Sequence, residues 1–157
     1  MKEIERKYLL KNASWKQEVI LSTTQYKQGY ISSKNGKVVR VRLTDSYAKL
    51  TVKGPTMGIS RDEFEYDIPL ADAKVMLDTL VEGSIIVKTR YVVLYGGKKW
   101  EIDVFSGDNK GLVTAEIELK SEKEKYKIPT WIGADISDER KYSNSNLVKN
   151  PYKNWVK

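Results

Sequence analysis

The sequence of 157 residues contains no cysteine and no histidine. The first absence excludes disulfides, thiolate catalysis and cysteine zinc sites, and the second removes the usual general base and the commonest metal ligand. No apolar run approaches the roughly 20 residues that cross a bilayer, and the N-terminus begins with charged residues rather than a secretory signal. We therefore expect a cytoplasmic protein without a membrane partner, which uses carboxylates, Lys, Arg, Tyr, Ser, Thr or a hard metal ion.

The charge balance is basic, with 28 Lys and Arg against 21 Asp and Glu, a net charge of +7. Such a balance suits a polyanionic partner. The bases are interleaved with carboxylates, however, and no nucleic-acid motif stands out, so we do not expect nucleic acid to be the partner. The length fits one domain, and no shift in composition divides residues 1–157.

Charged residues recur at every second position in most of the segments that resemble strands. The chain begins with Glu3-Ile-Glu5-Arg-Lys7, and in a strand these three numbered side chains share one face. The later segments place on one face the pairs Arg40 and Arg42, Lys49 and Lys53, Glu63 and Glu65, Lys88 and Arg90, Glu101 and Asp103, and Glu116 and Glu118.

An antiparallel sheet with one wet face also alternates polar and apolar residues, and that is the common cause of such a pattern. Here, however, each segment carries mostly one sign of charge, whereas a solvated face usually mixes the two. Like charges two residues apart destabilise a sheet. The pattern therefore favours an external group that compensates the charges.

Eight strands are predicted, at residues 2–9, 25–32, 38–44, 47–53, 62–68, 86–95, 99–105 and 113–120. Turn residues such as Lys34-Asn-Gly36 and Gly96-Gly97 favour antiparallel hairpins. Residues 70–82 have helical spacing and precede Gly83, a natural helix stop. Shorter helices are expected at 14–21, after a capping box at 121–124, and at 143–149. The fold class is mainly β (α+β).

The charged faces meet water if the sheet is open, and they line a tunnel if eight strands close into a barrel. The proposed lining has eight carboxylates against six bases, Lys7 included and Lys49 left out, a net charge of −2. Clustered carboxylates either become protonated or recruit cations, and all-oxygen ligands select Mg²⁺, Mn²⁺ or Ca²⁺. Arg and Lys suit phosphate oxygens, so the bases suggest a linear chain of phosphates.

The segments resemble, in order, the motifs of the CYTH superfamily, also called triphosphate tunnel metalloenzymes. Glu3-Ile-Glu-Arg-Lys7 is similar to its ExExK signature. The companion segments are Gln28-Gly-Tyr30, Val39-Arg-Val-Arg42, Leu50-Thr-Val-Lys-Gly54, Ser60-Arg-Asp-Glu-Phe-Glu65, Lys88-Thr-Arg-Tyr91, Glu101-Ile-Asp-Val-Phe105 and Ala115-Glu-Ile-Glu118. The resemblance covers residues 2–120 and extends to Trp131–Tyr142. It implies a closed eight-stranded antiparallel β-barrel with flanking helices, whose tunnel binds a triphosphate with divalent metal.

The resemblance also implies roles for individual residues. Glu3, Glu5 and Glu118 match the family's metal ligands, with Glu116 close by. Bases that match the phosphate-gripping set are Arg40, Arg42, Lys53, Lys88 and Arg90, and Lys7 sits beside the terminal phosphoryl group. Lys7, Glu5 and Glu116 are the candidate catalytic residues. Glu63, Glu65, Glu101 and Asp103 match carboxylates that support the bases or a second metal, although each can be an ordinary salt-bridge partner.

The sequences of these motifs most resemble those of the short bacterial inorganic triphosphatases. This resemblance implies hydrolysis of tripolyphosphate to pyrophosphate and phosphate with Mg²⁺ or Mn²⁺. In the expected reaction one ion polarises the phosphates, and a second ion or a carboxylate activates an in-line water. A class IV adenylate cyclase, which forms cyclic AMP from ATP, is the alternative within the family. A module that binds polyphosphate or nucleotide without turnover is the alternative outside enzymes. The sequence leaves the oligomeric state open, and a homodimer is one alternative.

Overall fold

The computed structural model describes residues 1–156, and antiparallel strands dominate that part of the chain. Their bounds are β1 (Lys2–Leu10), β2 (Val19–Lys34), β3 (Lys37–Leu43), β4 (Ala48–Lys53), β5 (Ser60–Ile68), β6 (Glu82–Tyr95), β7 (Lys98–Phe105), β8 (Val113–Glu118) and β9 (Ile132–Asp135). The helices are α1 (Leu70–Thr79) and α2 (Asn144–Leu147). Single 3₁₀ turns occur at η1 (Ser14–Gln17), η2 (Gly107–Asn109), η3 (Arg140–Tyr142) and η4 (Tyr152–Asn154).

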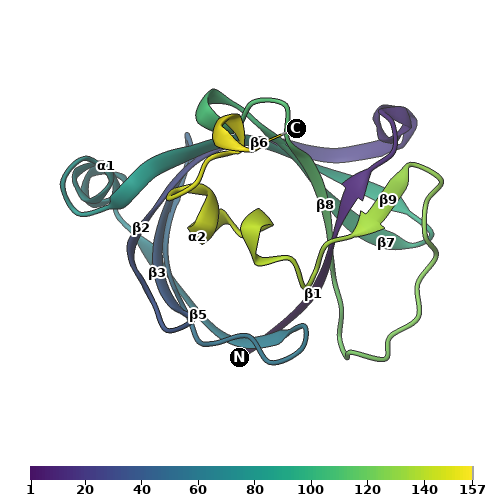
Figure 1. Ribbon diagram of the computed structural model, residues 1–157, viewed down its shortest axis with the longest axis horizontal. Coiled ribbons are helices and arrows are strands. Elements are labelled where there is room, and N and C mark those ends of the chain that lie inside the picture. The colour runs from purple at the N-terminus through teal and green to yellow at the C-terminus, as the bar shows by residue number, and fades with distance from the viewer. Residues whose placement is uncertain (157) are drawn as a thin grey trace.

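Eight of these strands form a closed ring in the order β5-β4-β3-β2-β6-β7-β8-β1, as the view down the barrel shows (Figure 1). The ring closes where Lys2, Glu3 and Ile4 of β1 pair with Asp62, Arg61 and Ser60 of β5. Strand β9 pairs with the far end of β1 and lies outside the ring. The predicted closed eight-stranded antiparallel barrel is confirmed, and the open-sheet alternative is wrong.

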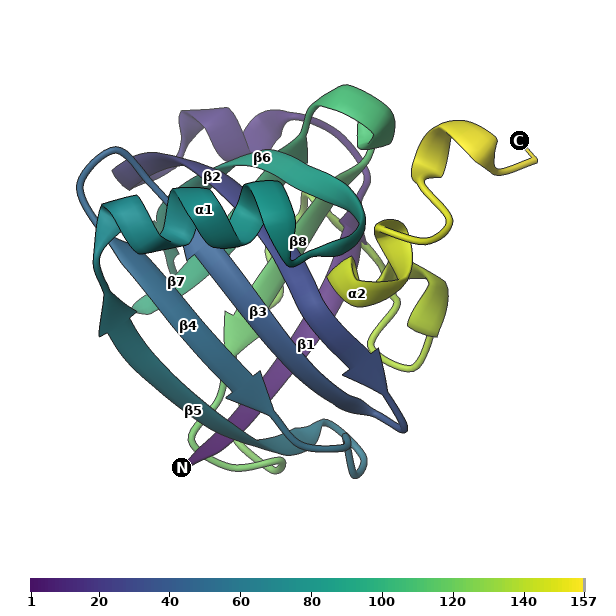
Figure 2. The same ribbon diagram turned by 90° about the vertical axis from the view of Figure 1, so that its left-hand side faces the viewer.

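The barrel carries its apolar side chains on the outside. On one flank, α1 packs Ala73 and Leu77 against Val41 and Ala48 of the sheet, and it crosses the outer surface of the strands (Figure 2). On the opposite flank, a second cluster surrounds Trp100, which is fully buried. Because the outer faces form the hydrophobic core, the alternate residues, which are the charged ones, point into the ring.

The C-terminal segment crosses one end of the barrel. Helix α2 lies inside the ring when the molecule is viewed down the barrel, and at one end of it when viewed from the side (Figures 1 and 2). Leu147 and Val148 hold it there, because they are buried with Tyr30 and Ile86 of the barrel. Within residues 1–156, no helix is both long and apolar enough to span a membrane.

Several predicted bounds were wrong. The helix predicted at 14–21 is only the turn Ser14–Gln17, because Val19 onward joins the ladder with β6 and lengthens β2 by six residues at its start. The capping box at 121–124 opens a single turn, and no helix follows it. Strand β9 was not predicted.

Gly83 is not a helix stop. Helix α1 ends at Thr79, and Gly83 lies inside β6 with a φ of +71°. A Cβ atom at this position would lie 2.5 Å from the carbonyl oxygen of Val148. The glycine therefore serves the close approach of the C-terminal segment to the barrel.

Candidate functional site

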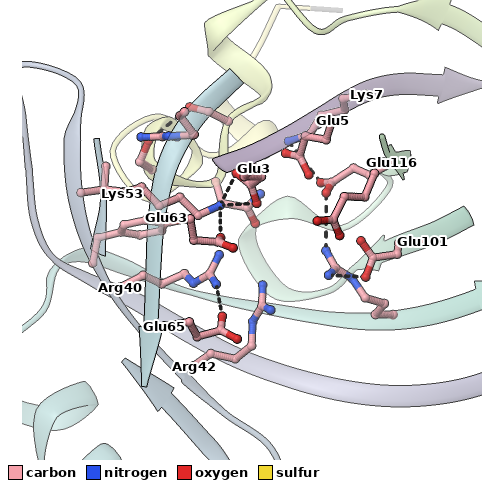
Figure 3. Close-up of a pocket in the computed structure, with 18 of the residues that line it drawn as sticks. Glu3, Glu5, Lys7, Arg40, Arg42, Lys53, Glu63, Glu65, Glu101 and Glu116 are labelled. Carbon is pink, nitrogen blue, oxygen red and sulfur yellow. Dashed lines mark hydrogen bonds and ion pairs between the residues drawn. The ribbon is translucent and has the colours of Figure 1, made fainter. Parts of the chain in front are cut away.

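The interior of the barrel contains a polar cavity of about 280 Å³. Its lining contains thirteen of the fourteen side chains that the sequence pattern selected, and Figure 3 shows carboxylates and bases converging from several strands. They are Glu3, Glu5, Lys7, Arg40, Arg42, Lys53, Glu63, Glu65, Lys88, Arg90, Glu101, Glu116 and Glu118. Asp103, the fourteenth, is fully buried and lies behind Lys88 and Arg90 rather than in the lining, so its predicted place in the tunnel wall was wrong.

Strand register sets which of these side chains meet. Arg40 of β3 lies directly opposite Thr51 of β4, which lies opposite Glu65 of β5. In the next row, Lys53 lies opposite Glu63. Directly opposed side chains on one face of a sheet interact, so bases of β3 and β4 are paired with acids of β5.

Lys53 forms ion pairs with two carboxylates at once. Its ammonium group lies 2.9 Å from Glu3 and 3.3 Å from Glu63. Burial alone would raise the pKa of Glu3, but Lys53 outweighs burial and holds that pKa below its ordinary value. Burial and the negative charge of Glu3 raise the pKa of Glu63. The two carboxylates thus lie close enough to share one cation.

Glu5, Glu116 and Lys7 form a second charged group. The Lys7 ammonium lies 3.5 Å from Glu116, which lies directly opposite it on β8. Burial, together with Glu116 and Glu3, raises the pKa of Glu5 well above its usual range. The pKa of Glu116 is held well below its usual range, because Lys7 and Arg90 outweigh its burial. Two carboxylates beside each other, Glu116 buried and Glu5 partly buried, favour the binding of positive charge.

Lys88 and Arg90 share the carboxylate of Asp103. Arg90 donates to it at 2.7 and 2.9 Å, and Lys88 donates at 2.7 Å. Although burial alone would raise it, Arg90 and Lys88 lower the pKa of Asp103 to about 2. Burial lowers the pKa of Lys88 to about 7 despite that partner, with the charges of Arg90 and Arg42 acting in the same direction. The buried acid therefore holds two bases at the cavity wall.

Arg42 and Lys88, two of the bases predicted to bind phosphate, are also connected to the C-terminal segment. The Arg42 Nε atom donates to Gln28 at 2.9 Å, and Gln28 in turn donates to Asn144 at 3.0 Å. The same Asn144 oxygen accepts from Lys88 at 3.3 Å. Burial and the neighbouring bases Arg40 and Arg90 lower the pKa of Arg42 to about 10. A base packed among other bases and away from water favours binding an anion.

The sequence reasoning gave no site role to three polar residues of this arrangement, namely Gln28, Thr51 and Asn144. Gln28 and Thr51 are fully buried and polar, and both lie on the inward faces of predicted strands, so alternation alone was a usable signal for them. Asn144 comes from a segment with no strand pattern, and Ser143 and Ser145 beside it also line the cavity. The place of Ser143, Asn144 and Ser145 in the cavity lining follows only from the three-dimensional structure.

The carboxylates are the chemical type that a hard divalent ion prefers. Among residues 1–156, no group of three or more Asp and Glu side chains is already gathered in the geometry of a metal site. Glu3, Glu5, Glu116 and Glu118 nevertheless line one cavity, and Glu5 lies opposite Glu118 in the β1–β8 ladder. The unfavourable charge of Glu5 beside Glu3 and Glu116 is what a divalent ion would relieve, so the donor set fits such an ion.

Comparison with known proteins gives a consistent result. The CYTH domain matches residues 1–150. An inorganic triphosphatase of Acetivibrio thermocellus is 46% identical over 154 residues, which cover 98% of this chain and 97% of that protein. An inorganic triphosphatase of Nitrosomonas europaea is 31% identical over 94% of this chain and 97% of its own length.

Solved structures with the same fold include the inorganic triphosphatase NE1496, with a TM-score of 0.67, 27% identity and 93% of both chains covered. A putative adenylate cyclase from Bacillus halodurans has a TM-score of 0.61 and covers 78% of this chain and 83% of its own. Because that protein is only 17% identical, the likeness concerns the fold alone.

Proposed function

This chain belongs to the CYTH family, and we propose from this premise that it hydrolyses inorganic triphosphate to pyrophosphate and phosphate inside the barrel. The observation that carries the proposal is one cavity inside the barrel in which acidic and basic side chains converge in similar numbers. The acids suit a divalent ion and the bases suit a chain of phosphates. The names of the curated relatives, both inorganic triphosphatases, support the same activity.

The bases of the cavity would bind and orient the substrate. Arg40, Arg42, Lys53, Lys88 and Arg90 line it from three strands, β3, β4 and β6, so they can contact a linear anion along its length. Lys7 would lie beside the terminal phosphoryl group. Negative charge develops on phosphate oxygens as the bond to the leaving group breaks, and preset cations stabilise that charge without reorganising.

The acids divide into two kinds. Glu3, Glu5, Glu116 and Glu118 would hold the divalent ion, for which we propose Mg²⁺ or Mn²⁺. Glu63, Glu65, Glu101 and Asp103 support bases, through ion pairs with Lys53, Arg40 and Arg90. Membership in the family implies a divalent metal, which supplies charge that polarises phosphate oxygens. In a chain without histidine, Glu5 and Glu116 beside Lys7 would be the acceptors for the proton of the attacking water.

Class IV adenylate cyclase activity is the second candidate. The barrel shared with a putative adenylate cyclase favours it only at the level of fold. The higher identity to triphosphatases, over nearly the full length of both proteins, favours hydrolysis. Either activity makes a small polyphosphate or nucleotide the partner.

An assay of three products separates these possibilities. Purified protein would be incubated with tripolyphosphate or ATP and either Mg²⁺ or Mn²⁺, and phosphate, pyrophosphate and cyclic AMP would be followed. Release of phosphate from tripolyphosphate supports the proposal, cyclic AMP from ATP supports the cyclase, and binding without product supports a module without turnover. Glu5→Ala should abolish the metal-dependent turnover with the fold retained, whereas Glu122→Gln on an exposed turn should match the parent.

We also propose that residues 1–157 act as one CYTH domain, which the match over residues 1–150 supports. The cytoplasmic location and a homodimer stay predictions. Gel filtration with light scattering would test the second of these.

A further inference from the structure

We propose that Thr51 is a positioning residue that keeps the guanidinium of Arg40 directed into the cavity and prevents its loose ion pair with Glu65 from closing into a direct hydrogen bond. The inference rests on the proposed function, because it assigns Arg40 to a phosphate of the substrate. Thr51 is fully buried, carries no charge and belongs to none of the acid or base sets described above.

The hydroxyl of Thr51 lies between an acid and a base. It accepts a hydrogen bond from Arg40 Nη2 at 3.2 Å and donates one to Glu65 at 3.1 Å. The register explains the contact, since Thr51 is the residue of β4 directly opposite Arg40 on one side and Glu65 on the other. One hydroxyl therefore bridges the base and the acid.

The separation of the two charged groups shows what the hydroxyl does. The closest approach of Arg40 to Glu65 is 3.6 Å (Figure 3), longer than a charge-assisted hydrogen bond of about 2.8 Å. Without the intervening hydroxyl, Arg40 would gain by moving onto the carboxylate. Such a hydrogen-bonded pair would tie the guanidinium to Glu65, which also lines the cavity, and would weaken its contact with the substrate.

The Nε donor of Arg40 is evidence that this site binds an anion. Arg40 is 6% exposed, and its Nε atom is buried without a hydrogen-bond partner among residues 1–156. A buried donor that lacks a partner is costly, so the site is arranged for an acceptor that arrives from outside. Thr51 engages Nη2 and does not satisfy Nε.

Replacing Thr51 with Val removes the hydroxyl and keeps the shape. Arg40 binds the same phosphate before and during the reaction, so a weaker contact lowers ground-state and transition-state binding alike. We therefore expect Thr51→Val to raise KM for tripolyphosphate about tenfold, with kcat within about twofold of the parent. Tripolyphosphate Kd, measured by calorimetry in the absence of metal, should rise by a similar factor. Thr51→Ser should restore both constants to within about twofold.

Thr89 provides the matched control. It lies on β6 between the cavity residues Lys88 and Arg90, so its side chain points to the outer face. Thr89→Val should leave KM, kcat and Kd unchanged. If Thr51→Val does not fold, Thr51→Ala takes its place, with Thr51→Ser again as the rescue.

A double-mutant cycle isolates the mechanism. If Glu65 is what attracts Arg40 once the hydroxyl is gone, Thr51→Val should cost about tenfold in KM with Glu65 present and no more than about threefold in a Glu65→Gln background. Equal costs in the two backgrounds would overturn the inference, as would a Thr51→Val enzyme with the parent KM and Kd. A parent protein that neither hydrolyses nor binds tripolyphosphate would instead overturn the proposed function, so the two failures can be told apart.

Discussion

Asp103→Asn should strongly destabilise the protein, because the substitution removes the counter-charge of two buried bases. Asp103 and Lys88 are essentially inaccessible to solvent, and Arg90 is 7% exposed. The carboxylate accepts three hydrogen bonds from the two bases, two of them at 2.7 Å. Asparagine keeps the shape, but its NH₂ group would face a donor.

The expected loss at pH 7 follows from the cost of an uncompensated buried charge. Removing one partner of a buried ion pair costs about 3–5 kcal/mol. A domain of ordinary stability has roughly 5–15 kcal/mol in total. The variant should therefore unfold at a much lower urea concentration than the parent.

The pH dependence gives a second, independent readout of the same contact. The folded protein lowers the pKa of Asp103 from 3.8 to about 2. A lowered acid pKa stabilises the folded state above the unfolded pKa, and this contribution is lost as the pH falls from about 4 to about 2. The parent should lose about 2 kcal/mol over that interval that the variant does not lose.

Urea unfolding followed by circular dichroism at pH 7, 5, 3 and 2 would measure both effects. Asp67→Asn is the control, because Asp67 also pairs with a lysine but its side chain is 81% exposed, so its loss should cost less than about 1 kcal/mol. The reasoning fails if Asp103→Asn costs no more than the control at pH 7. It also fails if the difference between parent and variant does not shrink as the pH falls below 4.

The other predictions concern Lys88, Gly83 and Trp131. The pKa of Lys88 is about 7 in the folded protein against an ordinary 10.5, so between these pH values the unfolded chain binds one more proton than the folded protein. The free energy of unfolding should therefore rise with pH by up to about 1.4 kcal/mol per pH unit. Urea titrations from pH 7 to 10 should show this slope in the parent and a flatter slope in Lys88→Met. Gly83→Ala should cost about 1–3 kcal/mol, measured as a lowered Tm, because it adds a Cβ against Val148 at a positive φ; Gly97→Ala, also at positive φ but with open space around it, should cost less. Trp131→Ala should cost about 3–5 kcal/mol in urea unfolding, because the buried ring packs edge-on against Trp100 and Tyr95; an exposed replacement such as Tyr66→Ala should cost far less.

The strands and their two faces could be predicted from the sequence because two signals agreed, whereas closure of the sheet into a barrel followed only from the resemblance to the CYTH superfamily. Alternation separated charged from apolar faces, and turn residues such as Asn35 and Gly36, both at positive φ, marked the hairpins. The ends of elements were less predictable. Val19, Ile20 and Leu21 were assigned to a helix although β-branched residues favour strands, and the ladder with β6 decided the matter.

The residues of the candidate site also fall into those that the sequence could predict and those that it could not. The charged residues on strands were found by their spacing, because every second side chain of a strand lies on the same face. Asp103 had the right spacing but lies behind Lys88 and Arg90, since burial depth is not encoded in alternation. Asn144 reaches Gln28 and Lys88 from more than 50 residues away along the chain, and such a contact follows from packing rather than from any local pattern.

The seam between β1 and β5 has a further consequence for the described part of the chain. Only three residue pairs join these strands, fewer than at any other junction of the ring. Glu3 lies at this junction, and its side chain reaches across to Lys53 on β4. Loss of this short ladder would open the barrel into a sheet and separate β1 from β5. The pairing that closes the barrel therefore also brings the acidic half of the cavity opposite its basic half.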